Sequence, residues 1–83
     1  MYEIILESSA IKFLKRLDNN IRKIIIQKME KLKTNPHLGI RLIGNFKGLW
    51  KYRMGNYRLI YKINNNKLVI VGVDIGHRRN IYK

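Results

Sequence analysis

The stretch KYRMGNYRLIYK, which runs from Lys51 to Lys62, constrains the fold of this chain more than any other segment. Glycine at the first central position of a two-residue turn is typical of a tight β-hairpin, so Gly55 and Asn56 predict a turn between two antiparallel strands. The turn also fixes which residues face each other across the strands: Met54 with Tyr57, Arg53 with Arg58, Tyr52 with Leu59, and Lys51 with Ile60.

Cross-strand partners point to the same face of a sheet, so the register separates the hairpin into two chemically different faces. The expected apolar face carries Trp50, Tyr52, Met54, Tyr57, Leu59, Tyr61 and Ile63. The expected cationic face carries Lys51, Arg53, Arg58, Ile60 and Lys62. We expect helices to cover the apolar face, which makes its aromatic row part of the core, and we expect the cationic face to stay open.

Arg53 directly opposite Arg58 costs stability, by up to about 1 kcal/mol for like charges in such a pair. An anion between them removes that cost, because guanidinium groups bind phosphate oxygens through two parallel hydrogen bonds. The pattern therefore favours a phosphate-binding face. A solvated face of a basic protein explains the same residues without a ligand.

Two helices are expected before the hairpin, after a short strand over Tyr2 to Glu7. In the first helix, Ser8 and Ser9 supply the N-cap, and apolar residues recur at helical spacing. Asn20 is expected to cap the second helix, and Asn35-Pro36 ends it because the residue before proline avoids the α region. The two apolar stripes consist of Ala10, Phe13, Leu14 and Leu17, and of Ile21, Ile24, Ile25, Met29 and Leu32.

The remaining segments complete a single domain over residues 1–83. Glycines at 39, 44 and 48 mark a loop between Leu38 and Gly48, and strands are expected over Leu49–Met54, Tyr57–Ile63 and Leu68–Ile75. The last strand is apolar on both faces and is expected at the centre of the sheet. The sequence leaves the register of this strand open, because a two-residue loop and a three-residue loop through the Asn64–Asn66 run would place opposite sets of its side chains on the cationic face. The expected fold class is α+β, in the order β-α-α-β-β-β, with a mostly antiparallel sheet and a helix pair on one face.

Charge and cysteine content limit the function classes. Eighteen Lys and Arg against five Asp and Glu give a net charge of +13, which predicts a polyanionic partner. Without cysteine the chain has no disulfide or thiolate metal site, and it fits a reducing cytoplasm. His37 and His77 cannot complete a zinc site alone, so we expect no metal and no cofactor. No targeting segment or membrane span is expected.

The stretches LWKYRMGNYRLIYKI and LVIVGVDIGHRRNIY resemble the RelE/ParE toxin superfamily of toxin–antitoxin systems, most closely its RelE branch. The resemblance spans essentially the whole chain and includes the basic-x-basic pair, the G-x-Y-R turn and the terminal G-x-R…Y. It implies a RelE-like fold and a ribosome-dependent endoribonuclease that cleaves mRNA in the A site, without metal, through attack by the substrate's 2′-OH. It also implies a cognate antitoxin, expected to be acidic and RelB-like, in an assembly for which 2:2 stoichiometry is left open.

Carried over by position, the resemblance implies five catalytic residues. Lys51 and Arg53 match the basic pair that assists proton transfer and stabilises charge, Arg58 matches a phosphate binder, Arg78 acts on the transition state or leaving group, and Tyr82 orients the nucleotide. Beside them, the residues expected to contact RNA are Lys47, Lys62, His77 and Arg79. Arg53 cannot act as a base because its pKa is too high, and no acidic residue is expected in the site.

Two other functions remain open at this point. A ParE-like protein would arrest growth by binding DNA gyrase and would have no nuclease site. An inactive, nucleic-acid-binding relative would have the same charge and fold. Retention of the basic pair together with Arg58, Arg78 and Tyr82 favours the nuclease.

Overall fold

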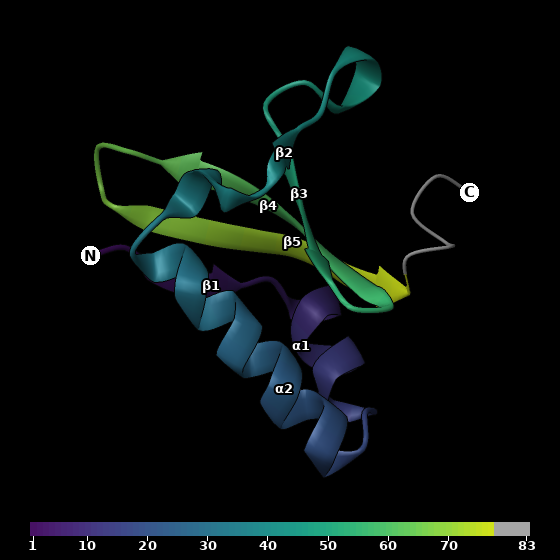
Figure 1. Ribbon diagram of the computed structural model, residues 1–83. Coiled ribbons are helices and arrows are strands. Elements are labelled where there is room, and N and C mark those ends of the chain that lie inside the picture. Colours follow the sequence, from purple (N-terminus) through teal and green to yellow (C-terminus); the bar gives the residue numbers. More distant parts are fainter. Residues whose placement is uncertain (78–83) are drawn as a thin grey trace.

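The computed structural model describes residues 1–77 and has the predicted α+β architecture (Figure 1). Its elements in chain order are β1 (Glu3–Leu6), α1 (Ser8–Lys15), α2 (Asn19–Glu30), the 3₁₀ turns η1 (Lys31–Lys33) and η2 (Pro36–Leu38), β2 (Ile40–Arg41), η3 (Gly44–Phe46), β3 (Trp50–Met54), β4 (Tyr57–Asn64) and β5 (Val69–His77). The five strands form one sheet in the order β1-β5-β4-β3-β2. β1 runs parallel to β5, and the other neighbours are antiparallel.

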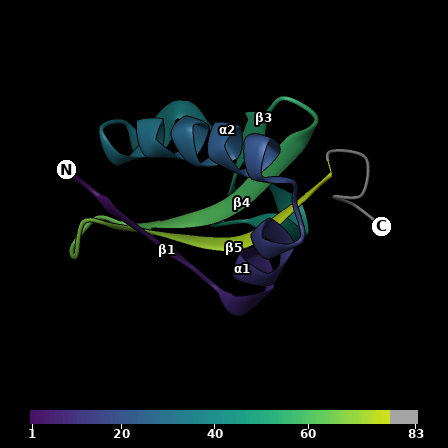
Figure 2. The same cartoon turned by 90° about the horizontal axis from the view of Figure 1, so that it is seen from below.

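Both helices lie on one face of the sheet, below it in Figure 1. Seen from that side in Figure 2, α2 lies toward β3 and α1 toward β5. Their apolar stripes meet the sheet in a core built from Ala10, Leu14, Ile25, Met29, Leu32, Met54, Leu59, Tyr61, Ile70 and Ile75. The other aromatic residues of the expected apolar face, Trp50, Tyr52 and Tyr57, pack against this core, as predicted.

Three details of the helices differ from the sequence-based expectation. Asp18, not Asn20, is the N-cap of α2, and its carboxylate accepts a hydrogen bond from the Asn20 backbone N–H. Glu7, and not Ser8 or Ser9, is at the N-cap position of α1, and no side chain caps this end; the Ser9 hydroxyl donates instead to the Val73 carbonyl oxygen of β5 at 3.0 Å. Ile21 and Ile24 were expected in the core but are 37% and 52% exposed, so the apolar stripe of α2 is wider than the surface that covers it.

The predicted loop between Leu38 and Gly48 contains a short strand. β2 pairs with β3 through Ile40 and Arg41, and the Leu42 N–H donates to the Leu49 carbonyl oxygen at 2.9 Å. The segment between these strands carries η3 and projects away from the sheet (Figure 1).

Tyr61 connects this region to the core. Its side chain is 0% exposed, and its hydroxyl donates to the Pro36 carbonyl oxygen at 2.7 Å. The same hydroxyl accepts from the Gly39 N–H at 3.2 Å. The ring of Trp50 stacks on Tyr61 and meets His37 edge to face. These contacts hold η2 and the start of β2 against β3 and β4.

The register of β5, which the sequence left open, includes a β-bulge. Asn64 pairs with Val69, so the connecting loop has four residues, 65–68. Ile60 pairs with Asp74 while Tyr61 pairs with Gly72, which leaves Val73 without a partner on β4. Ser9 of α1 binds the carbonyl oxygen of this extra residue, so docking of the helix stabilises the bulge.

Candidate active site

The β3–β4 hairpin has the predicted register. Arg53 faces Arg58, and Lys51 faces Ile60, across the pair of strands. Gly55 has a φ of +65°, a left-handed conformation that glycine adopts at little cost, and it allows the tight turn. The cationic side chains of the hairpin therefore project from one face of the sheet, opposite to the helices.

The cationic face is less open than the sequence predicted. Arg53 and Lys62 are exposed and Lys51 is half-buried, whereas Arg58 is only 3% exposed and Ile60 is also buried. The expectation of a uniformly open face is therefore wrong at its centre. A buried guanidinium keeps more of its electrostatic strength than an exposed one, since less water screens it.

The bulge in β5 determines which residues lie beside Arg58. Beyond the bulge, Arg58 pairs with Gly76, and Ile60 pairs with Asp74. One carboxylate oxygen of Asp74 lies 3.9 Å from Arg58 Nη2. Asp74 therefore stands on the cationic face, where no acidic residue was expected. The sequence gives no signal for this placement, because the strand is apolar on both faces and its alternation does not reveal the bulge.

Lys51 and Asp74 lie in one row across the sheet, because Ile60 pairs with both of them. Adjacent strands are about 4.8 Å apart, which places the two backbones roughly 10 Å from each other. Arg53, Arg58 and Gly76 form the neighbouring row. The face thus combines two guanidinium groups, one ammonium group and one carboxylate within the reach of a single nucleotide.

The other predicted residues fall in different places. His77 pairs with Tyr57, and their rings meet edge to face with centroids 5.7 Å apart. His77 therefore lies on the helix side of β5, and the structure does not bring it together with Arg58. Lys47 is exposed after η3 in the projecting segment, away from the paired arginines. Arg78, Arg79 and Tyr82 lie outside the described residues, so their roles stay predictions.

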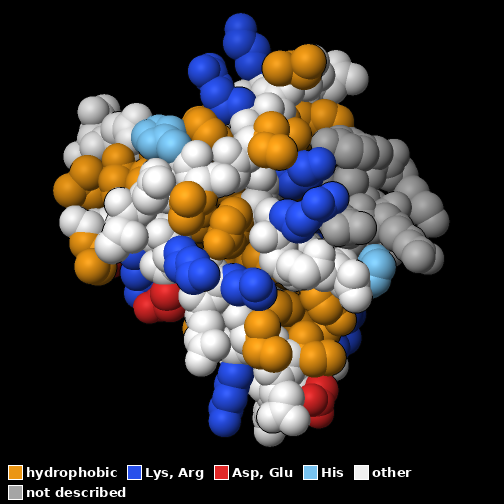
Figure 3. Space-filling model, in the orientation of Figure 1, with side chains coloured by type: hydrophobic (Ala, Val, Ile, Leu, Met, Phe, Trp, Pro, Cys, Tyr) orange, Lys and Arg blue, Asp and Glu red, His pale blue; other side chains and the backbone are white. Residues whose placement is uncertain are grey.

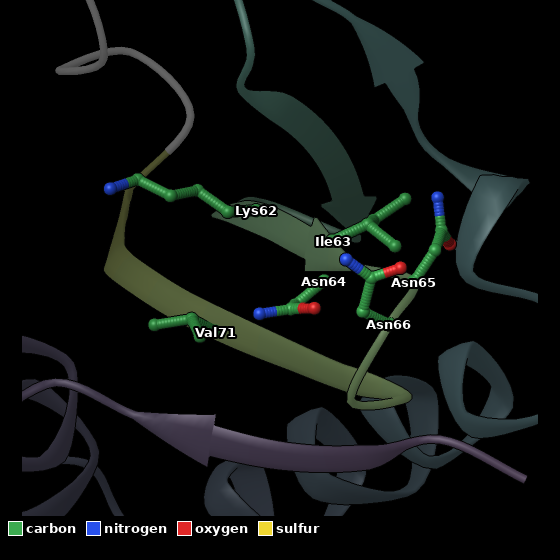
Figure 4. Close-up of a pocket in the computed structure, with 6 residues that line it drawn as sticks. All are labelled: Lys62, Ile63, Asn64, Asn65, Asn66 and Val71. Carbon is green, nitrogen blue, oxygen red and sulfur yellow. The ribbon is translucent and has the colours of Figure 1, made fainter.

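Within residues 1–77, three hollows border the hairpin, and two of them include residues predicted for the site. A cleft of about 290 Å³ lies beside the basic pair, lined by Leu38, Gly39, Ile40, Lys51, Tyr52 and Arg53. A second hollow of about 450 Å³ lies at the far end of β4 and β5 (Figure 4). Lys62 lines the second hollow and extends away from Asn64, Asn65 and Asn66, which line its other side. Of the two, only the first contains residues predicted to be catalytic.

Two tyrosines near the basic pair stay protonated at neutral pH. Burial raises the pKa of Tyr61 to about 12, although the hydrogen bond from Gly39 lowers it slightly. Burial also raises the pKa of Tyr52. Neither phenol is suited to accept a proton from a substrate hydroxyl. Among residues 1–77, no group of three or more His, Cys, Asp or Glu side chains could hold a metal ion.

Positive charge is not confined to the hairpin. Lys and Arg side chains are distributed over the face shown in Figure 3, and acidic side chains are few there. Charge alone therefore does not single out a site, and the hairpin face differs from the rest of the basic surface in the pairing of Arg53 with Arg58 beside Lys51. No helix within residues 1–77 is long and apolar enough to cross a membrane.

Solved structures with similar folds identify the class of protein. The chain resembles the toxin–antitoxin complex RelBE2 of Mycobacterium tuberculosis with a TM-score of 0.85 at 25% identity, covering 93% of this chain and 98% of that one. It resembles the fold of the isolated RelE toxin of Escherichia coli with a TM-score of 0.79 at 22% identity, covering 99% and 92% of the two chains. The fold is therefore that of the RelE/ParE toxins, as the sequence predicted.

Sequence comparison places the chain within that class. Residues 4–82 match the family model of the ParE toxin of the type II toxin–antitoxin system parDE. A candidate toxin of Methanocaldococcus jannaschii, RelE4, is 33% identical over 89 residues, covering 100% of this chain and 93% of its own length. The chain belongs to the ParE toxin family, and it is the toxin component of a type II toxin–antitoxin system.

Proposed function

We propose that this toxin is a ribosome-dependent endoribonuclease that cleaves mRNA in the A site. The observation that carries the proposal is the placement of Lys51, Arg53 and Arg58 on one face of the hairpin, with the two arginines paired across the strands. Such an arrangement suits a phosphate that gains negative charge during the reaction. Preorganised cations are among the strongest stabilisers of a transition state of that kind.

The proposed reaction needs no metal. The 2′-oxygen of one nucleotide attacks the adjacent phosphorus, and the bond from phosphorus to the 5′-oxygen of the next nucleotide breaks. The 2′-hydroxyl loses its proton, and the departing 5′-oxygen gains one. The products carry a 2′,3′-cyclic phosphate and a 5′-hydroxyl. Arg53 and Arg58 stabilise charge on the phosphate oxygens, and Lys51 is the one lysine of the basic pair that can transfer a proton.

Dependence on the ribosome follows from what the described face provides. Residues 1–77 place no histidine beside the paired arginines, and the nearby phenols stay protonated. A site without a strong base depends on accurate positioning of the 2′-hydroxyl, which the ribosome supplies by holding the mRNA. Lysines elsewhere on the +13 surface serve as non-specific contacts to ribosomal RNA. We therefore expect free RNA to be cleaved slowly.

The family model favours a second candidate function, because it describes the ParE toxin of the parDE system. A ParE-like toxin would bind DNA gyrase and would leave mRNA intact. Relatives designated RelE favour the nuclease instead.

One pair of assays separates the two functions. An in vitro translation reaction, analysed by primer extension, detects cleavage of ribosome-bound mRNA, and a supercoiling assay detects inhibition of gyrase. Codon-positioned cuts with 2′,3′-cyclic phosphate ends support the nuclease. Inhibited supercoiling with intact mRNA supports the gyrase poison. If neither activity is detected, the protein is an inactive, nucleic-acid-binding relative.

The partner of the toxin is proposed to be an acidic, RelB-like antitoxin. Several similar structures are complexes of RelE with RelB, including one from Pyrococcus horikoshii OT3. The +13 charge favours an acidic partner, since complementary charge accelerates association and selects the partner. A 2:2 assembly is tested by measuring the mass of the purified complex.

A further inference from the structure

The bulge in β5 changes the surroundings of Arg58. If the pairing of Asn64 with Val69 continued without interruption, Ile75 would lie opposite Arg58 and Asp74 would face the core. With Val73 as the extra residue, Gly76 lies opposite Arg58 instead. Ile75 then enters the core, and Asp74 reaches the cationic face. The bulge thus replaces a branched apolar neighbour of Arg58 with a glycine and a nearby carboxylate.

Because Gly76 has no side chain, the Arg58 guanidinium can occupy the space where a Cβ atom would lie. A Cβ atom built on Gly76 would lie 2.5 Å from Arg58 Nη1, closer than non-bonded atoms approach. The other near atoms are Cζ and Nη2 of the same side chain, so the backbone of a neighbouring strand would not be displaced. A methyl group at this position would therefore move the flexible end of Arg58 and leave the sheet intact.

Asp74 acts on the same guanidinium from the side. Its carboxylate oxygen lies 3.9 Å from Nη2, which is too long for a hydrogen bond but close enough for electrostatic attraction. The Asp74 side chain is 50% exposed whereas Arg58 is 3% exposed, so water screens one partner only. The attraction favours guanidinium orientations that keep Nη2 near β5.

We propose that Gly76 and Asp74 form a seat on β5 that orients the Arg58 guanidinium for the scissile phosphate. Both are positioning residues, since each acts through Arg58. The inference rests on the proposed nuclease function for its catalytic part. A guanidinium binds a phosphate only in a narrow range of orientations, and because Arg58 is 3% exposed, its contacts with β5 determine which edge of the guanidinium a phosphate can reach.

The test compares Gly76→Ala and Asp74→Asn with the control Glu3→Gln, which makes the same charge change on β1, an edge strand separated from β4 by β5. The first readout does not need activity. It is the ¹H–¹⁵N NMR signal of Arg58 Nε, which is assigned by its disappearance in Arg58→Lys. Both seat variants are expected to shift this signal while their melting temperatures stay within a few degrees of wild type. Glu3→Gln is expected to leave the signal unchanged. An unmoved signal in both seat variants would overturn the seat.

The second readout is single-turnover cleavage of ribosome-bound mRNA. We expect each seat variant to lower the maximal rate about 10- to 100-fold with little change in the toxin concentration at half-saturation, because orientation rather than binding is lost. In an Arg58→Lys background the same substitutions should change the remaining rate less than twofold. Equal losses in both backgrounds would mean that Gly76 and Asp74 act independently of Arg58 and would refute the inference.

The two readouts separate this inference from the proposed function. If the wild-type toxin cleaves no mRNA but the Arg58 signal moves in the seat variants, the nuclease proposal fails and the seat remains. If the toxin cleaves mRNA and neither the signal nor the rate responds, the seat fails and the nuclease remains. Should Gly76→Ala fail to fold, Asp74→Asn tests the same proposal, since an exposed Asp-to-Asn change alters charge without altering volume.

Discussion

Replacing Tyr61 with phenylalanine tests how the site is supported from below. The Tyr61 hydroxyl makes two hydrogen bonds, to the Pro36 carbonyl oxygen and from the Gly39 N–H. Phenylalanine keeps the ring and its stacking with Trp50 but removes both bonds. The segment that they hold leads into β2, which pairs with β3 at Lys51. The substitution therefore isolates the contribution of one buried hydroxyl to the edge of the site.

The expected loss of unfolding free energy in Tyr61→Phe follows from the burial of the hydrogen-bonded groups. A buried donor or acceptor left without a partner costs about 1–3 kcal/mol. The Tyr61 side chain is fully buried and the Gly39 contact is partly buried, so we expect a loss of roughly 2–4 kcal/mol from the two bonds together. In a domain of this size each 1 kcal/mol lowers the melting temperature by about 4–8 °C. Tyr61→Phe should therefore melt roughly 8–32 °C below wild type.

The pH dependence gives a second, independent signature. Because burial raises the pKa of Tyr61 to about 12 from 10.0, the folded state holds the phenolic proton more tightly than the unfolded state. This contribution to stability is complete below pH 10 and is lost as the pH rises toward 12. A shift of this size corresponds to about 3 kcal/mol at most. Tyr61→Phe should therefore lose less stability than the wild type as the pH rises above 10.

Urea unfolding from pH 7 to 11.5 measures both effects. Tyr2→Phe is the matched control, because the Tyr2 hydroxyl makes one exposed hydrogen bond to Asn65, at 2.7 Å. It should change stability by less than about 1 kcal/mol. A free energy of unfolding for Tyr61→Phe within about 0.5 kcal/mol of wild type, with the same decline at alkaline pH, would contradict both expectations.

Three further predictions concern the face, the core and the partner. Arg53→Gln should keep or raise the unfolding free energy, by up to about 1 kcal/mol, because it removes the like charge opposite Arg58; a clear loss in urea unfolding would contradict this. Met29→Ala should lower the unfolding free energy by about 2–5 kcal/mol, since Met29 is 3% exposed in the core, whereas the same change at exposed Gln27 should have little effect. Affinity for the antitoxin should fall as salt rises from 50 to about 500 mM, by calorimetry; a salt-independent affinity would exclude a charge-driven interface.

The hairpin could be predicted because its determinants are local. Gly55 and Asn56 fix the turn, and the alternation of cationic and apolar residues fixes both faces, so the register of Arg53 with Arg58 follows without tertiary information. The buried positions of α2 at Ile25 and Met29 followed equally from helical spacing.

The surroundings of Arg58 could not be predicted in the same way. They depend on the bulge at Val73, which is stabilised by Ser9 from a helix more than sixty positions earlier in the chain. Serine before a helix is usually read as a cap, and nothing local shows that its hydroxyl binds a distant strand. Exposure of Ile24 is likewise decided by how far the sheet extends beneath α2, and not by the helical pattern.

The central claim is that the chemistry takes place on the hairpin face and not elsewhere on a highly basic surface. The most direct measurement is the single-turnover rate of cleavage of ribosome-bound mRNA by Arg53→Ala, compared with Lys23→Ala, which removes one positive charge from an exposed position of α2. We expect a loss on the order of 100-fold or more for Arg53→Ala, which removes one transition-state contact, and less than about threefold for Lys23→Ala. Equal effects of the two substitutions would contradict the central claim, because cleavage would then depend on total charge and not on this face.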